Sequence, residues 1–426
     1  MRIPININYF KSEFTRNVIT LITGTTVAQI IPVVLQLILR RLFTPEAFGA
    51  FAIYFSVIGI IVVISTLKYE MAIVLPEKDK DAANIFILSL FINLVFNFLI
   101  LLILIFFRSF IVKFLNFPQQ FAFWLYFIPL SAFLFSSYQI INYWLIRQKA
   151  FKASSLNKIL RRSFEGITQI AFGFSGKSLG LVAGDIMGNI VNNIGGYFQI
   201  MLHGFSFKYF SLTKLKYVLR KYKQFPQFQA IPALMNTASL LLPFIIINKL
   251  YSGNITAQFD LSRMVLALPI ALISVSFSQV LLQKLSEKRR RKEKILKHIL
   301  KISLALFTLV IPGVIIIMLW GPDIFRLAFG LKWKEAGEFS QILVFTYAIQ
   351  FVVSPLAVIF PALEKIKIAA VWQTAYFIII VVLFLLRGLT VMEFITVYMY
   401  ITLVVYFVYW IMITKVARNY DSSVSK

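Results

Sequence analysis

The sequence contains no cysteine and only two histidines. Without cysteine the chain cannot form disulfides, thiolate metal sites or a thiol nucleophile. His203 and His298 both lie in basic, loop-like stretches, so a metal site built from histidine is not expected. A phosphate-binding loop of the form G-x-x-x-x-G-K-[ST] is also absent, so the chain lacks an ATP motor of its own. The sequence therefore predicts neither a metal nor a cofactor.

Charged residues are scarce as well, at 14% of the chain against about 25% in an average soluble domain. Hydrophobic residues reach 59%, which excludes an ordinary soluble globular protein of 426 residues. Apolar runs such as FILSLFINLVFNFLILLILIFF attain the roughly 20 residues that a helix needs to cross a bilayer. The predicted fold class is therefore an all-α membrane protein.

Twelve transmembrane helices are predicted from the hydrophobic windows between charge clusters. Their approximate limits are 17–39, 48–67, 83–107, 121–146, 155–175, 179–202, 228–250, 254–282, 299–320, 337–361, 366–386 and 391–414.

Acidic residues are few, with 17 Asp and Glu against 43 Lys and Arg, and the basic residues are unevenly placed. Of the 43, 28 fall in the termini and loops on one side of the predicted membrane and 10 on the other. The positive-inside rule then places both termini in the cytoplasm. The N-terminal stretch shows no cleavable signal pattern. Loops such as QKLSEKRRRKEKILKH are explained by topology and attraction to anionic membrane lipids, and nucleic acid is not expected as a partner.

The stretch NKILRRSFEG places four charges at i, i+3, i+4 and i+7, which is one face of a helix. A span that began after these charges would be about 20 Å long, too short to cross, so they must lie within the membrane. They cannot face lipid at an insertion cost of about 2.5–3.5 kcal/mol each. We expect an anion-attracting cavity; a buried ion-pair network is the alternative. The residues are Lys158, Arg161, Arg162 and Glu165.

The next predicted span carries a polar stripe at i, i+4, i+7 and i+8, formed by Asp185, Asn189, Asn192 and Asn193. It lines the same cavity or makes hydrogen bonds between helices. Gly180, Gly184 and Gly188 mark another side of this helix, where a neighbouring backbone can approach closely.

The span 254–282 carries Asp260 and Arg263 at i, i+3. They form an ion pair or serve as an outer gate or proton-sensitive element. Proton coupling is assigned as a hypothesis to Glu165, Asp185 or Asp260. Glu70, at the inner end of the second span, is interpreted as a helix-end anchor.

The basic segment 203–227 divides the spans into two groups of six. The predicted domains are an N-terminal six-helix bundle, 1–202, a basic cytoplasmic linker, 203–227, and a C-terminal six-helix bundle, 228–426. A faint parallel between AQIIPVVLQLILRRLFTPEAFGAF and ASLLLPFIIINKLYSGNITAQF suits two bundles that rock in alternating access. The expected architecture is a V-shaped alternating-access transporter.

Several stretches resemble the oligosaccharide repeat-unit flippases of O-antigen and capsule synthesis, in the polysaccharide transporter family of the MOP exporter superfamily. They include LRRLFTPEAFGAFAIYFS, LKYEMAIVLPEKDKDAANIF, KYKQFPQFQAIPALMNTASLLLP and LSRMVLALPIALISVSFSQV. The resemblance continues in GPDIFRLAFGLKWKEAGEFSQILVF and covers most of residues 15–375.

The resemblance implies transport of undecaprenyl-pyrophosphate-linked oligosaccharide repeat units from the inner to the outer leaflet of the bacterial cytoplasmic membrane. It implies no enzymatic activity, and Lys158, Arg161 and Arg162 would form the cationic lumen. The expected partners are this lipid-linked substrate, membrane lipids, and a polysaccharide polymerase and chain-length regulator, with the chain itself a monomer. A drug/cation antiporter of the same superfamily is the first alternative, although it predicts an acidic cavity. A non-transporting membrane scaffold is the second.

Overall fold

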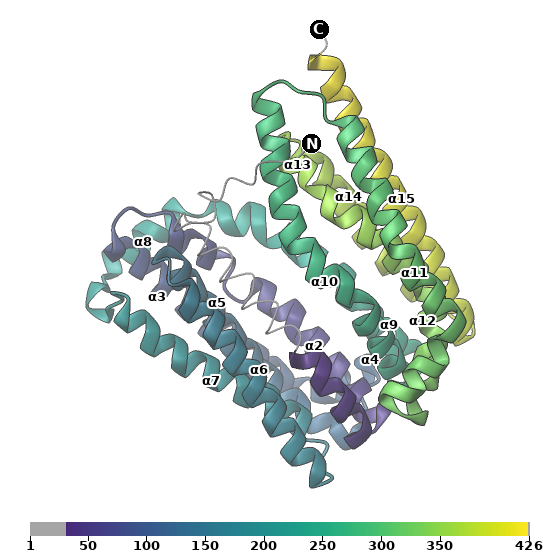
Figure 1. Ribbon diagram of the computed structural model, residues 1–426. Helices are drawn as coiled ribbons and strands as arrows, with labels where there is room; N and C mark the ends of the chain where they lie inside the picture. The colour runs from purple at the N-terminus through teal and green to yellow at the C-terminus, as the bar shows by residue number, and fades with distance from the viewer. Residues whose placement is uncertain (1–30, 425–426) are drawn as a thin grey trace. The chain divides into compact units, whose positions relative to one another are not determined.

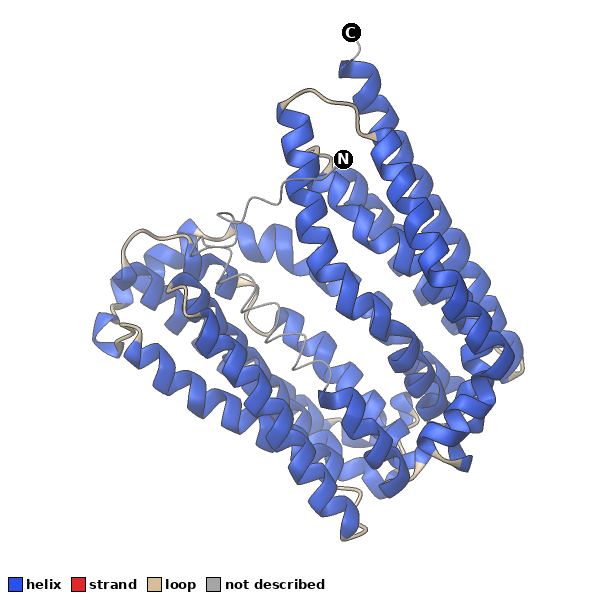
Figure 2. Ribbon diagram, viewed as in Figure 1, coloured by secondary structure: helices blue, strands red, loops and turns tan. Residues whose placement is uncertain are grey.

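The computed structural model describes residues 31–424, except for the side chains of residues 271–276 and 279. In this part of the chain every regular element is a helix, and the connections are short (Figures 1 and 2). Contacts divide the chain into two compact units, Met1–Thr237 and Ala238–Lys426. The predicted basic linker, 203–227, belongs to the first unit, and the division falls within one helix, α9.

The first unit carries the helices up to α8 and the start of α9. Residues 31–42 are helical and precede the first helix with a label in Figure 1. The elements that follow are α2 (Pro45–Ile64), η2 (Tyr69–Val74), α3 (Asp79–Phe106), α4 (Arg108–Leu115), η3 (Gln119–Phe127), α5 (Ile128–Arg147), α6 (Phe151–Phe174), α7 (Gly180–Leu202), η4 (Phe207–Tyr209), α8 (Leu212–Lys221), η5 (Pro226–Ala230) and α9 (Ile231–Leu250).

The second unit holds the rest of α9 and the remaining helices. They are α10 (Gly253–Arg290), α11 (Leu296–Phe329), η6 (Leu331–Trp333), α12 (Lys334–Val353), η7 (Ser354–Val358), α13 (Ile359–Ala362), α14 (Ile366–Val382), η8 (Leu383–Leu385) and α15 (Val391–Val424).

Side-chain caps mark the starts of three helices, two of them from the local sequence. Thr44 caps α2 by accepting a hydrogen bond from the Ala47 amide at 3.3 Å, and Pro45 occupies the first helical position. Ser252 caps α10 in the same way through the Ile255 amide. The start of α11 is capped from another helix, because the carboxylate of Asp421 on α15 accepts from the amides of Ile295 and Leu296.

Eight segments of the described chain are long and apolar enough to cross a membrane. They are Pro45–Ile64, Asp79–Phe106, Gln119–Arg147, Pro226–Leu250, Leu296–Phe329, Leu331–Ala362, Ile366–Leu385 and Val391–Val424. Three further helices, α6, α7 and α10, have 24, 23 and 38 residues, which is enough length to span, but they carry more polar residues.

Eleven of the twelve predicted spans coincide with helical segments of the structure, to within a few residues except where a helix runs on beyond the predicted span. The predicted span 17–39 lies outside the described residues as far as residue 30. The chain is a multi-pass, all-α membrane protein, as its sequence predicts.

The connection after α7 is not a free loop. Asn84 on α3 donates to the Tyr209 carbonyl at 2.8 Å and accepts from the Ser211 amide at 3.0 Å. The Tyr69 hydroxyl donates to the Leu219 carbonyl, and Lys214 pairs with Asp81 at 2.8 Å. The sequence predicted a basic linker here and missed helix α8, which docks on the first unit.

Candidate functional site

The charged stretch around residue 160 lies in the middle of α6, which begins at Phe151 and ends at Phe174. Its apolar face is exposed at Phe164 and Ile167, where a membrane protein meets lipid or another apolar surface. On its charged face, Arg161 contacts both α5 and α7 and keeps only 9% of its surface exposed. The stretch is therefore helical, with Arg161 on its buried side and Phe164 and Ile167 on its exposed side.

Helix α7 packs very closely against this face. A Cβ atom added at Gly188 would lie 2.8 Å from the Arg161 carbonyl oxygen and 2.9 Å from Glu165 Cβ. At Gly184 it would lie 2.7 Å from the Glu165 carbonyl oxygen. The glycine run predicted from sequence thus brings the polar stripe of α7 next to the charges of α6.

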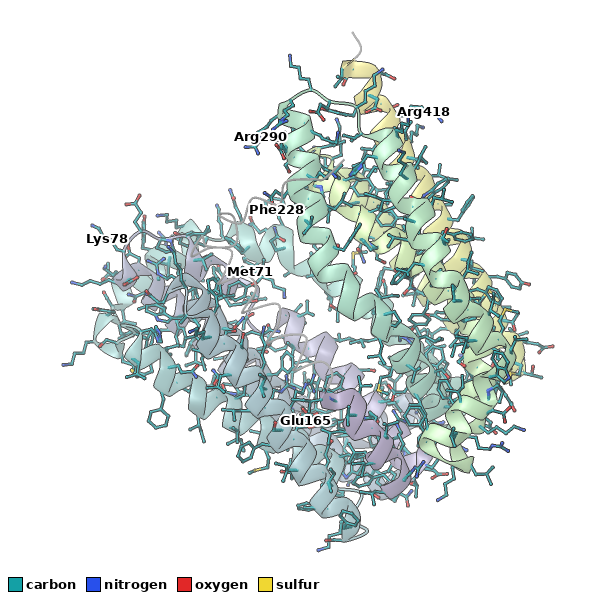
Figure 3. All side chains as sticks on the ribbon, viewed as in Figure 1. Met71, Lys78, Glu165, Phe228, Arg290 and Arg418 are labelled. Atoms are coloured by element: carbon teal, nitrogen blue, oxygen red, sulfur yellow. The ribbon has the colours of Figure 1, made fainter. Side chains whose placement is uncertain are left out.

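Two ion pairs join the charges of the site. Arg162 Nη1 lies 2.8 Å from Glu165 Oε2, three positions further along α6. Arg161 Nη2 lies 3.5 Å from Asp185 Oδ1, across the two helices, and both side chains are nearly excluded from the surface. Figure 3 labels Glu165 on its helix among the surrounding side chains.

The second ion pair changes the charge count of the site. By sequence spacing alone, the charged face of α6 has three cations and one acid, Glu165, which is an excess of two positive charges. Asp185 supplies a second carboxylate from the neighbouring helix, so Lys158, Arg161 and Arg162 exceed the acids by one formal charge. The site is cationic by a smaller margin than the sequence suggested.

The polar stripe of α7 is buried and only partly satisfied. Asn189 donates to Asp185 Oδ1 at 3.0 Å, and Asn193 donates to the Leu134 carbonyl on α5 at 2.8 Å. Among described residues, no hydrogen-bond partner meets the buried side-chain oxygens of Asn189, Asn192 and Asn193, or Arg161 Nε and Nη2. Such groups are costly to bury, so the unmatched acceptors of the three asparagines point to water or a polar ligand.

Three residues complete the environment that sequence reasoning did not find. The Arg161 guanidinium carbon lies 4.7 Å from the centre of the Phe135 ring, a cation–π contact. The Tyr54 hydroxyl and Ser131 Oγ are 2.6 Å apart, buried, and close enough to the Asp185 carboxylate to interact with it. All three residues sit in apolar runs with no local signal that they face a charge.

Arg263 belongs to the second unit, on α10. The i, i+3 spacing suggested an ion pair with Asp260, but the hydrogen bonds of Arg263 go instead to neutral acceptors. Nε donates to the Tyr347 hydroxyl at 2.8 Å, and Nη1 donates to the Leu240 carbonyl at 2.7 Å. Its guanidinium carbon also lies 4.6 Å from the centre of the Phe244 ring. The site of the second unit is thus a cation held by neutral and aromatic groups.

Residues 38–338 match the model of a family described as polysaccharide biosynthesis protein. No curated protein matches the sequence significantly.

Solved structures of similar fold include an inward-facing multidrug resistance MATE family transporter of the MOP superfamily, with a TM-score of 0.76 and 14% identity, covering 93% of this chain and 95% of that one. The lipid II flippase MurJ gives a TM-score of 0.72 and 13% identity over 95% and 90% of the two chains. A MOP superfamily transporter from Pyrococcus furiosus, described by a reversed polarity of its binding pocket, has a TM-score of 0.58 and 13% identity. The match covers 96% of this chain and 95% of that one. At these identities the likeness establishes a shared fold.

Proposed function

Because the chain belongs to the polysaccharide biosynthesis protein family and has the fold of MOP superfamily transporters, we propose that it is a flippase for lipid-linked oligosaccharides. The substrate would be an oligosaccharide repeat unit on undecaprenyl pyrophosphate, moved from the inner to the outer leaflet of the bacterial cytoplasmic membrane. The lipid II flippase among the structural neighbours supports a lipid-linked substrate.

The observation that carries the proposal is a buried, cation-rich polar site with unused hydrogen-bonding groups. A pyrophosphate needs cations and donors, which Lys158 and Arg162 offer on the partly exposed side of α6. Sugar hydroxyls need both acceptors and donors, and the unmatched side-chain oxygens of Asn189, Asn192 and Asn193 provide acceptors. In a site shielded from bulk water, these interactions are stronger than they would be in solution.

Geometry gives the two arginines different roles in this proposal. Arg161 is buried and paired with Asp185, so it holds α6 against α7. It acts on a ligand through its positive electrostatic potential and not by direct contact. Arg162 keeps 31% of its side chain exposed and can reach a ligand by leaving Glu165. The side chain of Glu165 is 13% exposed and that of Asp185 only 2%, so Glu165 is the better placed carboxylate for proton exchange.

A drug/cation antiporter is the second candidate, because a multidrug resistance transporter shares the fold. The charge of the site argues against it. A cationic drug needs an excess of carboxylates, and the five ionisable residues of this cluster carry an excess of one positive charge. For the Pyrococcus furiosus transporter, pocket polarity was likewise linked to a different function.

The test is complementation of a strain whose surface polysaccharide depends on this protein. We expect Arg162→Ala, Lys158→Ala and above all their combination to reduce surface polysaccharide at least tenfold at equal membrane levels, with partial recovery by Arg162→Lys. Arg326→Ala is the matched control, because Arg326 also pairs with an acid three positions away on its own helix, but its side chain is 56% exposed. Normal polysaccharide in the stably inserted double variant would contradict the assigned site.

A further inference from the structure

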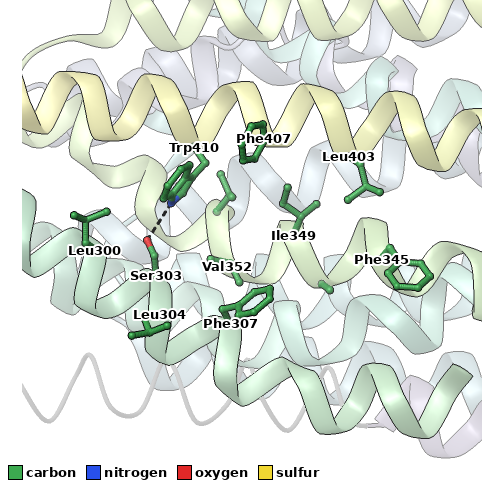
Figure 4. Close-up of a pocket in the computed structure, with 12 residues that line it drawn as sticks. Leu300, Ser303, Leu304, Phe307, Phe345, Ile349, Val352, Leu403, Phe407 and Trp410 are labelled. Carbon is green, nitrogen blue, oxygen red and sulfur yellow. Dashed lines mark hydrogen bonds between the residues drawn. The ribbon is translucent and has the colours of Figure 1, made fainter.

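An apolar groove runs along the second unit between α11, α12 and α15 (Figure 4). Its volume is about 490 Å³, and all three helices belong to membrane-spanning segments. Leu304, Phe307 and Phe407 stand at its rim with more than half of their surface exposed. In a bilayer these rim residues meet lipid, so the groove is accessible to hydrocarbon from the membrane.

The few polar atoms in the groove are already engaged. The Trp410 indole nitrogen donates to Ser303 Oγ at 3.2 Å, and this hydroxyl donates to the Ile299 carbonyl at 3.0 Å. The remaining lining is aliphatic and aromatic, with Ile349, Val352 and Leu403 on the facing helices. An occupant would therefore gain dispersion contacts and no hydrogen bonds, as a hydrocarbon chain does.

The end of the groove nearest the start of α11 is cationic. Leu304 also lines an adjoining groove of about 580 Å³, whose wall includes Lys301. Lys284 and Lys288, from the end of α10, add positive potential at the His298 ring together with Lys301, although Lys288 is itself paired with Glu293 at 2.7 Å. In the described part of the chain no partner meets the buried Nε2 of His298.

A hydrocarbon groove with lysines at its membrane-surface end matches a hydrocarbon chain that carries an anionic headgroup. We propose that the second unit binds an anionic phospholipid, with one acyl chain in the groove and its phosphate held by Lys301 and Lys284. A free phosphate would leave the groove unused, and a zwitterionic lipid would gain little from the lysines. This site shares no residue with the polar cluster of α6 and α7, so it stands independently of the proposed transport function.

Trp410 lines the groove and reports its occupant, because bromine atoms on an acyl chain quench indole fluorescence on contact. The protein is placed in nanodiscs of phosphatidylcholine that contain a small fraction of chain-brominated phosphatidylglycerol or chain-brominated phosphatidylcholine. The signal of Trp410 is the difference between the wild type and Trp410→Phe. We expect the anionic lipid to quench this signal at a mole fraction at least fivefold lower than the neutral lipid.

Variants separate the cations from the groove. Lys301→Gln is expected to reduce the preference for the anionic lipid about fivefold, whereas Lys332→Gln, an exposed lysine beyond the other end of α11, leaves it unchanged. Ala348→Phe fills the groove and is expected to abolish preferential quenching of Trp410. Ile378→Phe, on an exposed position of α14, is its control.

Two results would overturn the proposal. Equal quenching by the two brominated lipids in the wild type would show that the lysines select no headgroup. In a competition experiment, a polyprenyl phosphate could displace the brominated lipid and restore Trp410 fluorescence more effectively than unbrominated phosphatidylglycerol does. That result would assign the groove to a prenyl chain instead. Lys301 is exposed, so Lys301→Gln remains informative even where Ala348→Phe fails to fold.

Discussion

Arg161 and Asp185 hold opposite charges inside the first unit, and each depends on the other for compensation. Asp185→Asn would leave the guanidinium buried without a countercharge, which typically costs about 3–5 kcal/mol. We expect a clear drop in the thermal unfolding midpoint of the detergent-solubilised protein, measured by intrinsic fluorescence. The neutral double variant Arg161→Met with Asp185→Leu should have an unfolding midpoint much closer to that of the wild type. Equal destabilisation by both would show that the ion pair is not the cause.

Glu70 gives a pH dependence whose sign follows from burial. It lies on η2, outside the membrane spans, with 1% of its surface exposed, and it accepts a hydrogen bond from Thr66 at 2.5 Å. Burial raises the pKa of Glu70, and the Thr66 hydrogen bond and the Lys68 charge offset only part of this rise. The folded state therefore favours the protonated acid, so stability decreases as the pH rises from the unfolded-state pKa, near 4.3, through the raised folded-state pKa.

Glu70→Gln removes this titration and retains an acceptor for Thr66. We expect the variant to melt about 2 °C above the wild type at pH 8 and to converge with it near pH 4. The measurement is the unfolding midpoint across this pH range, with Glu335→Gln, an exposed acid on α12, as the control. A difference in unfolding midpoint between Glu70→Gln and the wild type that does not change with pH would point to packing instead of ionisation.

At the scale of elements, the contact between α6 and α7 depends on the absence of side chains. Gly188→Ala would force a methyl group to 2.8 Å from the Arg161 carbonyl, which costs about 1–3 kcal/mol in a packed interior. Gly313 on α11 has open space around the equivalent position, so Gly313→Ala should be neutral or slightly stabilising. Parallel melting curves of the two variants test this contrast. A Gly188→Ala protein as stable as Gly313→Ala would show that the helices can separate freely.

The sequence predicted these helices well because their signals are local. Run length and charge spacing located eleven helices, and the i, i+3, i+4, i+7 pattern identified the buried face of α6. The partner of Arg161 could not be found in this way, since Asp185 meets it only when the glycines of α7 allow close packing. The neutral acceptors of Arg263 are equally hidden, because Tyr347 lies 84 positions away on α12. Pairings between helices depend on packing, which periodicity does not encode.

At the scale of the whole molecule, the connection between α7 and α9 carries six lysines and arginines, yet it is held to the first unit. Asn84→Ala removes two hydrogen bonds to this connection, each worth about 1 kcal/mol. We expect trypsin to cleave between residues 203 and 227 roughly tenfold faster in the variant, because local opening becomes more frequent. Mass spectrometry of the fragments locates the cuts, and Asn419→Ala, at an exposed position of α15, is the control. An unchanged cleavage rate would mean that other contacts hold the segment.

The polarity of α6 and α7 also bears on how the chain enters the membrane during synthesis. Neither helix is among the eight segments that are apolar enough to span by composition, and α6 brings Lys158, Arg161 and Arg162 with a single acid. Each of these cations disfavours insertion of an isolated helix by roughly 2.5–3.5 kcal/mol. Asp185 arrives only with the following helix, after a turn of a few residues. We therefore expect the translocon to release α6 and α7 together as a hairpin, so that the pair that stabilises the folded protein first serves its biogenesis.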